Sequence, residues 1–234
     1  MNIHAFANAN EGAIAAAGYI AAQFRLAVSA RRRFTLALSG GTSPLRMFDA
    51  LTGETIRWKH VHLFQVDERL VPSDSPERNF ARVRERLLAH VDIPPGQVYA
   101  MPVELDDPKA AAKAYAATLR RVLGADGVLD LVHLGLGADG HTASLLPDDT
   151  ALESNADVIV SRPYQGFRRL SLSLPLISAA RERLWLVTGT EKSRALKSLI
   201  DGDRTVPAGR VARDNATVFH SLPDPFPGRT PVYS

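Results

Sequence analysis

Short apolar runs alternate along this chain with longer segments in which apolar residues recur every three or four positions. The runs contain few polar residues, which is typical of strands that a parallel sheet buries on both faces. The segments between them have the helical period, with polar residues on the opposite face. The predicted strands are 34–38, 61–66, 98–103, 128–136, 157–160, 169–174, 184–188 and 216–219, and the predicted helices are 11–29, 44–51, 77–90, 107–123, 175–180 and 193–200.

The order of these elements predicts the fold class. Strands and helices alternate through most of the chain, and right-handed crossovers between parallel strands place helices on both faces of a sheet. The sequence contains no internal repeat and no low-complexity linker. We therefore expect one domain, residues 1–234, of the α/β class, with a three-layer, mostly parallel, open sheet flanked by helices on both faces.

The first helix is alanine-rich, and we expect Asn10 to be its N-cap. A signal peptide is the alternative interpretation, but the segment lacks a basic start and carries Glu11. No run approaches the ~20 apolar residues of a membrane span. We therefore interpret the segment as an amphipathic helix of the mature protein. Its expected buried stripe is Ile14, Ala17, Ala21, Phe24 and Val28.

Composition and charge limit the classes of function. The 234 residues include 45% hydrophobic and 23% charged residues, with a net charge of +3 and no cysteine. These values are typical of a globular protein, and a chain without cysteine suits the cytoplasm. We interpret the basic run Arg31–Arg33 as a solvated helix end, and the arginines of helix 77–90 as a solvated face. No nucleic acid, membrane or obligate protein partner is expected.

A Ser/Gly loop follows the strand at 34–38. It comprises Ser39, Gly40, Gly41, Thr42 and Ser43, and a helix follows directly after it. Glycines expose backbone N–H groups, hydroxyl groups add donors, and a helix N-terminus favours an anion, so the loop suits a phosphate group. A plain tight turn is the alternative. No Gly-Lys-Ser/Thr sequence follows, so a nucleoside triphosphate is not expected.

The central stretch, residues 128–147, combines a buried strand with a glycine-rich loop. Asp139 and His141, an acceptor and a proton carrier, lie among its glycines. Residues 135–140 have the spacing G-x-G-x-x-G, but a dinucleotide site also needs a helix behind the third glycine and an acid at the end of a second strand. The sequence lacks this context, so we interpret the spacing as a coincidence.

Polar residues follow four of the predicted strands, at 39–43, 67–69, 137–141 and 189–192. The carboxyl ends of parallel strands share one edge of a sheet, so these segments are expected to converge. That edge would hold acids, a histidine, an arginine, a lysine and exposed N–H groups. Such a set suits a small phosphorylated substrate and acid–base chemistry.

Five segments together resemble 6-phosphogluconolactonases, which belong with the glucosamine-6-phosphate deaminases in a superfamily with a Rossmann-like sheet and no nucleotide. The resemblance implies hydrolysis of 6-phospho-D-glucono-1,5-lactone to 6-phosphogluconate in the oxidative pentose phosphate pathway, without a cofactor or a metal. The segments are LALSGGTSP (36–44), VDERLVP (66–72), LGLGADGHTASLLP (134–147), RLSLSLP (169–175) and VTGTEKSRAL (187–196).

The resemblance also implies residue roles. His141 matches the general base, and Asp67 and Asp139 match the acidic positions of the family. The loop Ser39–Ser43 matches phosphate-handling positions together with Arg69 and Lys192, and Arg169 matches an arginine that leads a strand. Histidine, with an unperturbed pKa of about 6.5, can take a proton from water at neutral pH. Whether Asp139 or Asp67 orients it is left open.

Two comparisons distinguish the lactonases from the deaminases. The deaminases have a glutamate where this chain has Leu146, and a tyrosine where it has Arg69; both differences favour the lactonase. The chain departs from lactonases at 164–166, where Tyr-Gln-Gly replaces a proline-rich segment, and in the tail after Asp201. The alternatives are a sugar-phosphate isomerase or deaminase of the same superfamily and a non-catalytic sugar-phosphate sensor.

Overall fold

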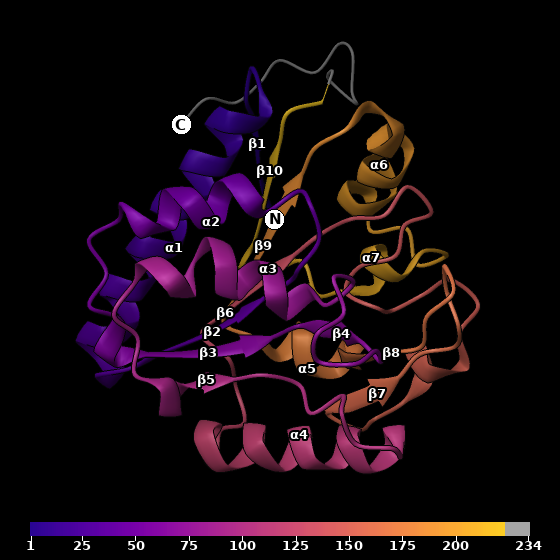
Figure 1. Ribbon diagram of the computed structural model, residues 1–234. Helices are drawn as coiled ribbons and strands as arrows, with labels where there is room; N and C mark the ends of the chain where they lie inside the picture. Colours follow the sequence, from indigo (N-terminus) through magenta and orange to yellow (C-terminus); the bar gives the residue numbers. More distant parts are fainter. Residues whose placement is uncertain (223–234) are drawn as a thin grey trace.

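The computed structural model describes residues 1–222, which form a central seven-stranded sheet covered by helices on both faces (Figure 1). The strand order is β1-β10-β9-β6-β2-β3-β5, and all neighbours in this sheet are parallel. The predicted α/β class and three-layer sheet are confirmed. The elements are β1 (Asn2–Ala5), α1 (Ala9–Arg31), β2 (Phe34–Leu38), α2 (Leu45–Thr52), β3 (Val61–Gln65), β4 (Asp67–Arg69), α3 (Asn79–Arg86), β5 (Val98–Tyr99), α4 (Pro108–Leu123), β6 (Leu131–Leu134), β7 (Val158–Val160), β8 (Arg169–Leu172), α5 (Leu174–Ala179), β9 (Glu182–Val187), α6 (Ser193–Asp201), α7 (Pro207–Arg210) and β10 (Ala216–His220).

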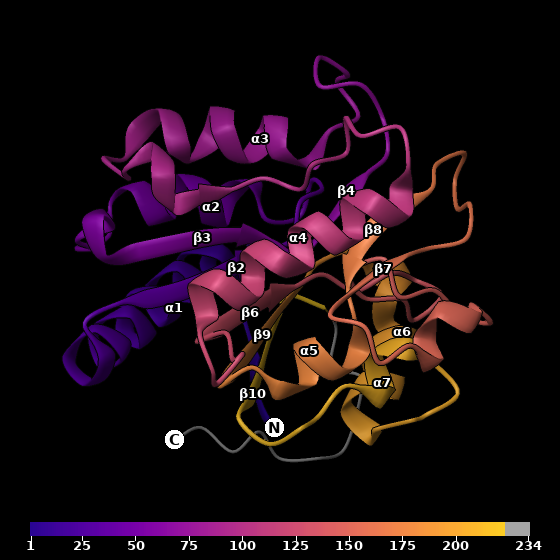
Figure 2. The ribbon, with the colours of Figure 1, turned by 90° about the horizontal axis from the view of Figure 1, so that it is seen from below.

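The alternation of side chains along each strand builds two hydrophobic cores, one on each face of the sheet. Leu36 and Leu131 pack on one face with α1, α2 and α3, whereas Ala37 and Val132 pack on the other with α4 to α7 (Figure 2). Successive side chains of a strand point to opposite faces, so a strand buried on both faces must be apolar throughout. This explains why the apolar runs located the central strands correctly.

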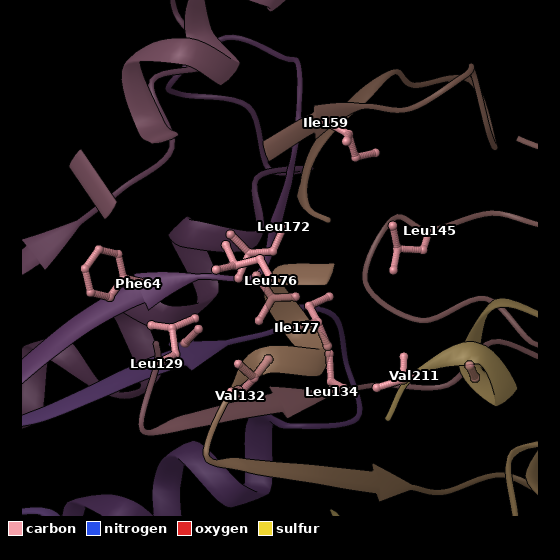
Figure 3. Packing of buried hydrophobic residues seen from close by; sticks show 14 of the residues in the cluster. Phe64, Leu129, Val132, Leu134, Leu145, Ile159, Leu172, Leu176, Ile177 and Val211 are labelled. Atoms are coloured by element: carbon pink, nitrogen blue, oxygen red, sulfur yellow. The ribbon is translucent and has the colours of Figure 1, made fainter. Parts of the chain in front are cut away.

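The second core also anchors the glycine-rich loop that follows β6. Leu145 lies in this core with Leu134, Leu172 and Ile177 (Figure 3), and Leu146 is fully buried. The loop therefore leaves the sheet at Leu134, and the burial of Leu145 and Leu146 about ten residues later anchors its other end. The residues between these two anchors are held in a defined position.

Three strands form a small antiparallel sheet, in the order β4-β8-β7, that the sequence analysis did not foresee. We expected residues 67–69 at the carboxyl edge of the parallel sheet, but β4 pairs with β8, with Asp67 opposite Ser171 and Arg69 opposite Arg169. The two strands are a hundred residues apart in sequence, and no local pattern reveals such a pairing.

Helix α1 begins and packs differently from the prediction. Asn8, not Asn10, is the N-cap, and its side chain accepts hydrogen bonds from the backbone N–H groups of Asn10 and Glu11, both at 3.0 Å. Ile14 is 53% exposed, because the helix instead turns its small residues toward the sheet. Length and composition alone would let α1 span a membrane, although the helix lies against the sheet. The residues buried on α1 are Gly12, Ala13, Ala16, Ala17, Ile20, Ala21, Phe24 and Ala27.

Two strand predictions at the edges of the sheet were wrong. β1 was missed, because its four residues are all exposed and show no apolar alternation. β5 ends at Tyr99 rather than at residue 103. The N–H group of Met101 donates to the Gln65 side chain at 2.8 Å, and Pro102 has no N–H group, so neither can extend the strand. The end of the divergent tail, residues 223–234, lies outside the described residues.

The basic run at the end of α1 is only partly solvated, contrary to the prediction. Arg31 forms an ion pair of 2.7 Å with the buried Asp130, and Arg33 donates to two carbonyl groups at the end of α4. Arg32 caps α1 in the left-handed conformation, with φ of 60°. The run therefore joins α1 to neighbouring elements.

Candidate active site

A cavity of about 530 Å³ opens where the chain leaves the carboxyl ends of β2, β6 and β9. The structure brings every residue predicted for the site to the wall of this one cavity. They are Ser39, Gly40, Gly41, Thr42, Ser43, Asp67, Arg69, Asp139, His141, Arg169 and Lys192. Eleven residues from five separate segments thus meet at one place, although β4 and β8 contribute from the small sheet.

Asp139 and His141 form a hydrogen-bonded pair in the loop after β6. The distance between His141 Nδ1 and Asp139 Oδ1 is 2.6 Å, and the His141 N–H group donates to the same oxygen at 3.2 Å. The hydrogen bond from His141 holds the pKa of Asp139 well below its usual range, so the carboxylate only accepts. Nδ1 therefore carries the proton, and the lone pair is left on Nε2.

Glycines give this loop the room that the pair needs. A Cβ atom at Gly137 would overlap the His141 ring and lie 2.7 Å from Asp139 Oδ1. Gly140 has φ of +83°, and its carbonyl group accepts from the Ala208 N–H group at 3.0 Å, while a Cβ atom at this position would contact Val206. The glycine spacing that mimics a dinucleotide motif thus accommodates a histidine and the segment before α7.

Asp67 lies deeper, on the wall formed by β4. The Ser144 hydroxyl donates to Asp67 Oδ2 at 2.6 Å, and the Ser144 N–H group in turn donates to the Ser171 hydroxyl. Burial raises the pKa of Asp67, and the nearby charge of Glu68 acts in the same direction. The acid that contacts His141 is therefore Asp139, while Asp67 is bound to the other half of the same loop.

The Ser/Gly loop and Lys192 also line the cavity and form a basic part of its wall. Gly41 has φ of +95°, and the adjoining Gly40 packs so closely on Asn79 that a Cβ atom would overlap its side chain. Pro44, which we expected in the first turn of α2, is instead its N-cap, one position before the helix begins. Lys192 ends a short 3-10 helix (Thr190–Lys192) after β9, and burial lowers the pKa of its amine. This wall therefore suits an anion.

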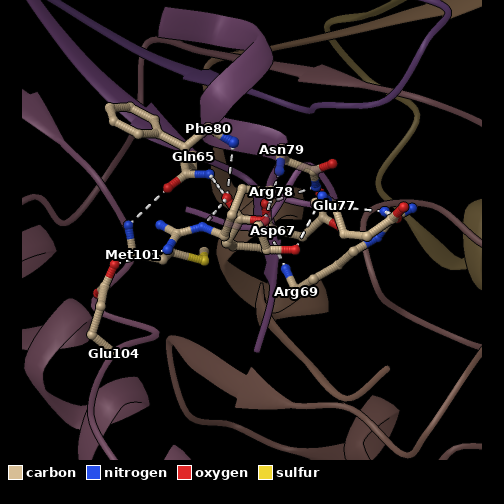
Figure 4. Close-up of polar contacts among 11 residues, drawn as sticks. Gln65, Asp67, Arg69, Glu77, Arg78, Asn79, Phe80, Met101 and Glu104 are labelled. Atoms are coloured by element: carbon tan, nitrogen blue, oxygen red, sulfur yellow. Dashed lines mark hydrogen bonds and ion pairs between the residues drawn. The ribbon is translucent and has the colours of Figure 1, made fainter. Parts of the chain in front are cut away.

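A buried carboxylate, Glu68, positions residues beside the cavity, and its partners Arg69, Arg78, Asn79 and Phe80 are labelled in Figure 4. It accepts from the backbone N–H groups of Arg69, Asn79 and Phe80 at 2.8 to 2.9 Å and so caps α3. It also forms an ion pair of 3.2 Å with Arg78, which is 4% exposed. Arg78 therefore corrects the prediction of a solvated arginine face, because a buried charge requires a partner.

Two arginines face each other across β4 and β8. Arg69 is opposite Arg169, and Arg69 also pairs with Glu77. Burial lowers the pKa of Arg169. Each guanidinium group lies over an aromatic ring, Arg69 over Phe167 at 5.3 Å and Arg169 over Tyr164 at 5.1 Å, measured to the ring centroids. The cavity wall thus carries two further cations whose positions are set by aromatic rings.

Over residues 7–219 the chain matches the family described as glucosamine-6-phosphate isomerases/6-phosphogluconolactonase. The chain belongs to this family. A 6-phosphogluconolactonase of Synechocystis sp. is 37% identical over 174 residues, which cover 73% of this chain and 72% of that protein. The human GDH/6PGL endoplasmic bifunctional protein is 44% identical over 186 residues, which cover 74% of this chain but only 23% of that much longer protein. A crystal structure of 6-phosphogluconolactonase from Thermotoga maritima superposes with a TM-score of 0.85 at 26% identity, covering 95% of this chain and 99% of that one. The resemblance inferred from the five sequence segments is confirmed.

Five further polar or charged residues line the cavity of this family member that the sequence analysis did not assign to the site: Asn79, His133, Tyr164, Gln165 and Glu191. Asn79 and His133 gave no signal, because single polar residues in a helix start and a strand are common, and Glu191 was noted only as part of the polar segment 189–192. Tyr164 was noted only as a departure from other lactonases. Among the described residues, no group of three or more His, Cys, Asp or Glu side chains is arranged to hold a metal ion.

His133 lies on β6 at the floor of the cavity and is 1% exposed. Neither of its ring nitrogens, nor the hydroxyl of the nearby Ser39, has a hydrogen-bond partner among residues 1–222. Burial lowers the pKa of His133 to about 3, so the ring is neutral at physiological pH. In the unfolded chain it would titrate near its ordinary value, and folding therefore binds fewer protons at this site.

Acidification is expected to destabilise the protein through His133. A histidine whose folded-state pKa is depressed contributes stability above pH 6.5 that is lost as the pH falls, by about 2 kcal/mol at pH 5. Urea unfolding of wild type and of His133→Leu, each at pH 7.5 and pH 5, measures this contribution. The wild type should lose about 2 kcal/mol more than the variant between the two pH values. Equal losses would mean that the buried ring does not resist protonation.

Proposed function

We propose that this chain hydrolyses 6-phospho-D-glucono-1,5-lactone to 6-phosphogluconate, a reaction of the oxidative pentose phosphate pathway, with His141 as the general base. The observation that carries the proposal is that the Asp139–His141 pair lines the same cavity as the Ser/Gly loop and Lys192. A base and an anion-binding wall within one cavity of this size fit a phosphorylated sugar lactone. We also propose that the reaction takes place in the cytoplasm.

The chemistry follows from the tautomer of His141. A δ-lactone is an activated ester, so a positioned water molecule suffices as the nucleophile. Nε2 takes the proton of that water as its oxygen attacks the carbonyl carbon, and Asp139 stabilises the imidazolium ion that forms. The protonated ring then returns a proton to the ring oxygen when the carbon–oxygen bond breaks.

The remaining residues bind and orient the substrate. Lys192 and the N–H and hydroxyl groups of residues 39–43 hold the phosphate group, which places the carbonyl group near the base. Arg69 and Arg169 are the cations nearest to the developing oxyanion. Asp67 accepts a hydrogen bond from a sugar hydroxyl group, for which its second oxygen, Oδ1, is available beside the one bound by Ser144.

The deaminase alternative is not favoured by the site. Leu146, at the position of the deaminase glutamate, is fully buried outside the cavity lining, and its side chain has no carboxylate. A lactone-hydrolysis assay, corrected for spontaneous ring opening, tests the proposal by comparing phosphorylated with unphosphorylated gluconolactone. We expect the phosphorylated lactone to be strongly preferred. Ammonia release from glucosamine 6-phosphate, without lactone hydrolysis, would contradict the proposal.

Substitution of Lys192 by alanine is expected to raise KM by about 10-fold to 100-fold, with kcat changed by less than about 3-fold, because a charge-assisted hydrogen bond to the phosphate group is lost. Initial rates over a range of lactone concentrations measure both constants. Lys113→Ala, at an exposed position of α4 outside the cavity, is the matched control. An unchanged KM in Lys192→Ala would remove this residue from the phosphate site.

A further inference from the structure

Residues 164–167 form a tight turn that is held beside the cavity. The N–H groups of Tyr164 and Phe167 each donate to the carbonyl group of the other, at 2.9 and 3.1 Å. The two central residues have positive φ, +50° at Gln165 and +83° at Gly166, as a two-residue hairpin turn of type I′ requires. In such a turn the two flanking residues form a cross-strand pair whose side chains lie on the same face.

Tyr164 contacts the acid–base pair directly. Its hydroxyl donates to Asp139 Oδ2 at 3.1 Å, while Asp139 Oδ1 contacts His141 Nδ1. The carboxylate therefore has one partner on each oxygen, and both partners fix its rotation. The Tyr164 ring also meets the His141 ring edge to face, with 5.3 Å between centroids. Partial burial and the charge of Asp139 raise the pKa of Tyr164, so the hydroxyl remains a donor.

The two rings of the turn also face the two arginines of the site. Arg169 lies over Tyr164 and Arg69 over Phe167, and these arginines are opposite each other in the β4–β8 pair. Like charges at opposite positions of an antiparallel pair destabilise it. The negative face of an aromatic ring attracts a guanidinium group, so the two rings offset this repulsion and fix where each cation lies.

We infer that the turn 164–167 is a positioning element of the active site, in which the Tyr164 hydroxyl holds Asp139 against His141 and the rings of Tyr164 and Phe167 hold Arg169 and Arg69 beside the cavity. The inference rests on the proposed function for its kinetic consequences. It assigns a role to the segment that departs from the proline-rich sequence of other lactonases.

Steady-state kinetics of the full chain tests the hydroxyl separately from the ring. Tyr164→Phe keeps the ring under Arg169 and removes the bond to Asp139, so kcat should fall by about 5-fold while KM stays within about 2-fold. Tyr164→Leu removes both contacts and should also raise KM by about 5-fold. Tyr99→Phe is the matched control, because its hydroxyl contacts His62 outside the cavity. Wild-type kcat in Tyr164→Phe would overturn the inference.

A double-mutant cycle distinguishes positioning from a general structural role. In an Asp139→Ala background the Tyr164 hydroxyl has lost its acceptor, so adding Tyr164→Phe should change kcat by less than about 1.5-fold. Multiplicative losses in the double variant would show that the hydroxyl does not act through Asp139. Phe167→Leu should raise KM and leave kcat nearly unchanged, since it removes the ring over which Arg69 lies and leaves the Tyr164 hydroxyl on Asp139.

A spectroscopic measurement separates this inference from the proposed function. Nitrogen-15 NMR spectra of the histidine rings, with His141 assigned by its loss in His141→Ala, report the contact with Asp139 without substrate. Tyr164→Phe should shift the His141 ring resonances, and Tyr99→Phe should not. A wild-type chain without lactonase activity would refute the proposed function while leaving this result intact, whereas unshifted His141 resonances would refute the positioning role.

Discussion

Replacement of His141 by alanine is expected to lower kcat by about 100-fold or more, with a free energy of unfolding close to that of the wild type. The rate falls because the other neutral imidazole of the cavity, His133, is buried in its floor with a pKa lowered to about 3, which makes it a much weaker base. Lys192 is assigned to the phosphate group, and Asp139 and Asp67 accept hydrogen bonds already. The fold persists because the loop is held by Leu145 and Leu146 and by the hydrogen bond from the Gly137 N–H group to the His141 carbonyl group, at 2.9 Å.

Two further variants sharpen this test. His141→Asn keeps a polar side chain near Asp139 but cannot take a proton, and it should lose as much activity as the alanine variant. His90→Ala, at an exposed position, controls for the loss of a histidine. Initial rates corrected for spontaneous opening, together with urea unfolding, measure both effects. If His141→Asn kept more than about a tenth of wild-type kcat, the ring would act by orientation rather than as a base.

Substitution of Gly137 by alanine is expected to lower kcat by about 10-fold to 100-fold, although the change adds a single methyl group. That methyl group would occupy the space of the His141 ring, and it would crowd Asp139 Oδ1 as well. The backbone of Gly137 does not have positive φ, so alanine imposes no conformational strain of its own. The ring must therefore move, and the hydrogen bond that fixes its tautomer is lost.

Kinetics and stability measured together identify the cause of this effect. The kcat of Gly137→Ala should fall, whereas its midpoint of urea unfolding should stay near that of the wild type. The fold is retained because His141 is at the surface of the loop and its ring can rotate away. Gly96→Ala is the control, because a Cβ atom at that glycine meets nothing within 4 Å. Wild-type kcat in Gly137→Ala would show that the observed position of the His141 ring is not the one used in the reaction.

The sequence predicted those parts of the fold that depend on local patterns of apolar and polar residues. The central strands are apolar on both faces, so β2, β3, β6 and β9 could be located from their runs alone. β1 could not be found, because an exposed edge strand carries no such pattern. The pairing of β4 with β8 depends on contacts between distant segments. Residues 67–69 were therefore placed at the right cavity but in the wrong sheet.

For the site, the sequence identified the residues that line the cavity better than it identified which of them contact one another. The glycine loop and its histidine are recognisable because the chemistry requires them at fixed spacing. Which acid orients His141 depends on side-chain rotation, and only the structure places Asp139, not Asp67, in contact with it. Tyr164 and Asn79 reach the cavity from a turn and a helix start, where neither position has a periodic signal. Arg78 was misjudged because its buried partner Glu68 lies on β4, outside the helix whose pattern was read.

The contact of Gly140 with Val206 and Ala208 has a consequence for sequence divergence in the tail. The sequence analysis found a poor match to lactonases after Asp201, whereas the family model matches as far as residue 219, and part of this stretch supports the glycine loop from behind. A bulkier side chain at position 206, or a deletion that shifts α7, would push on the turn that holds the histidine. Sequence change in this part of the chain is therefore limited by side-chain volume and by the path of the backbone more than by residue identity. A sequence comparison alone does not reveal such a limit.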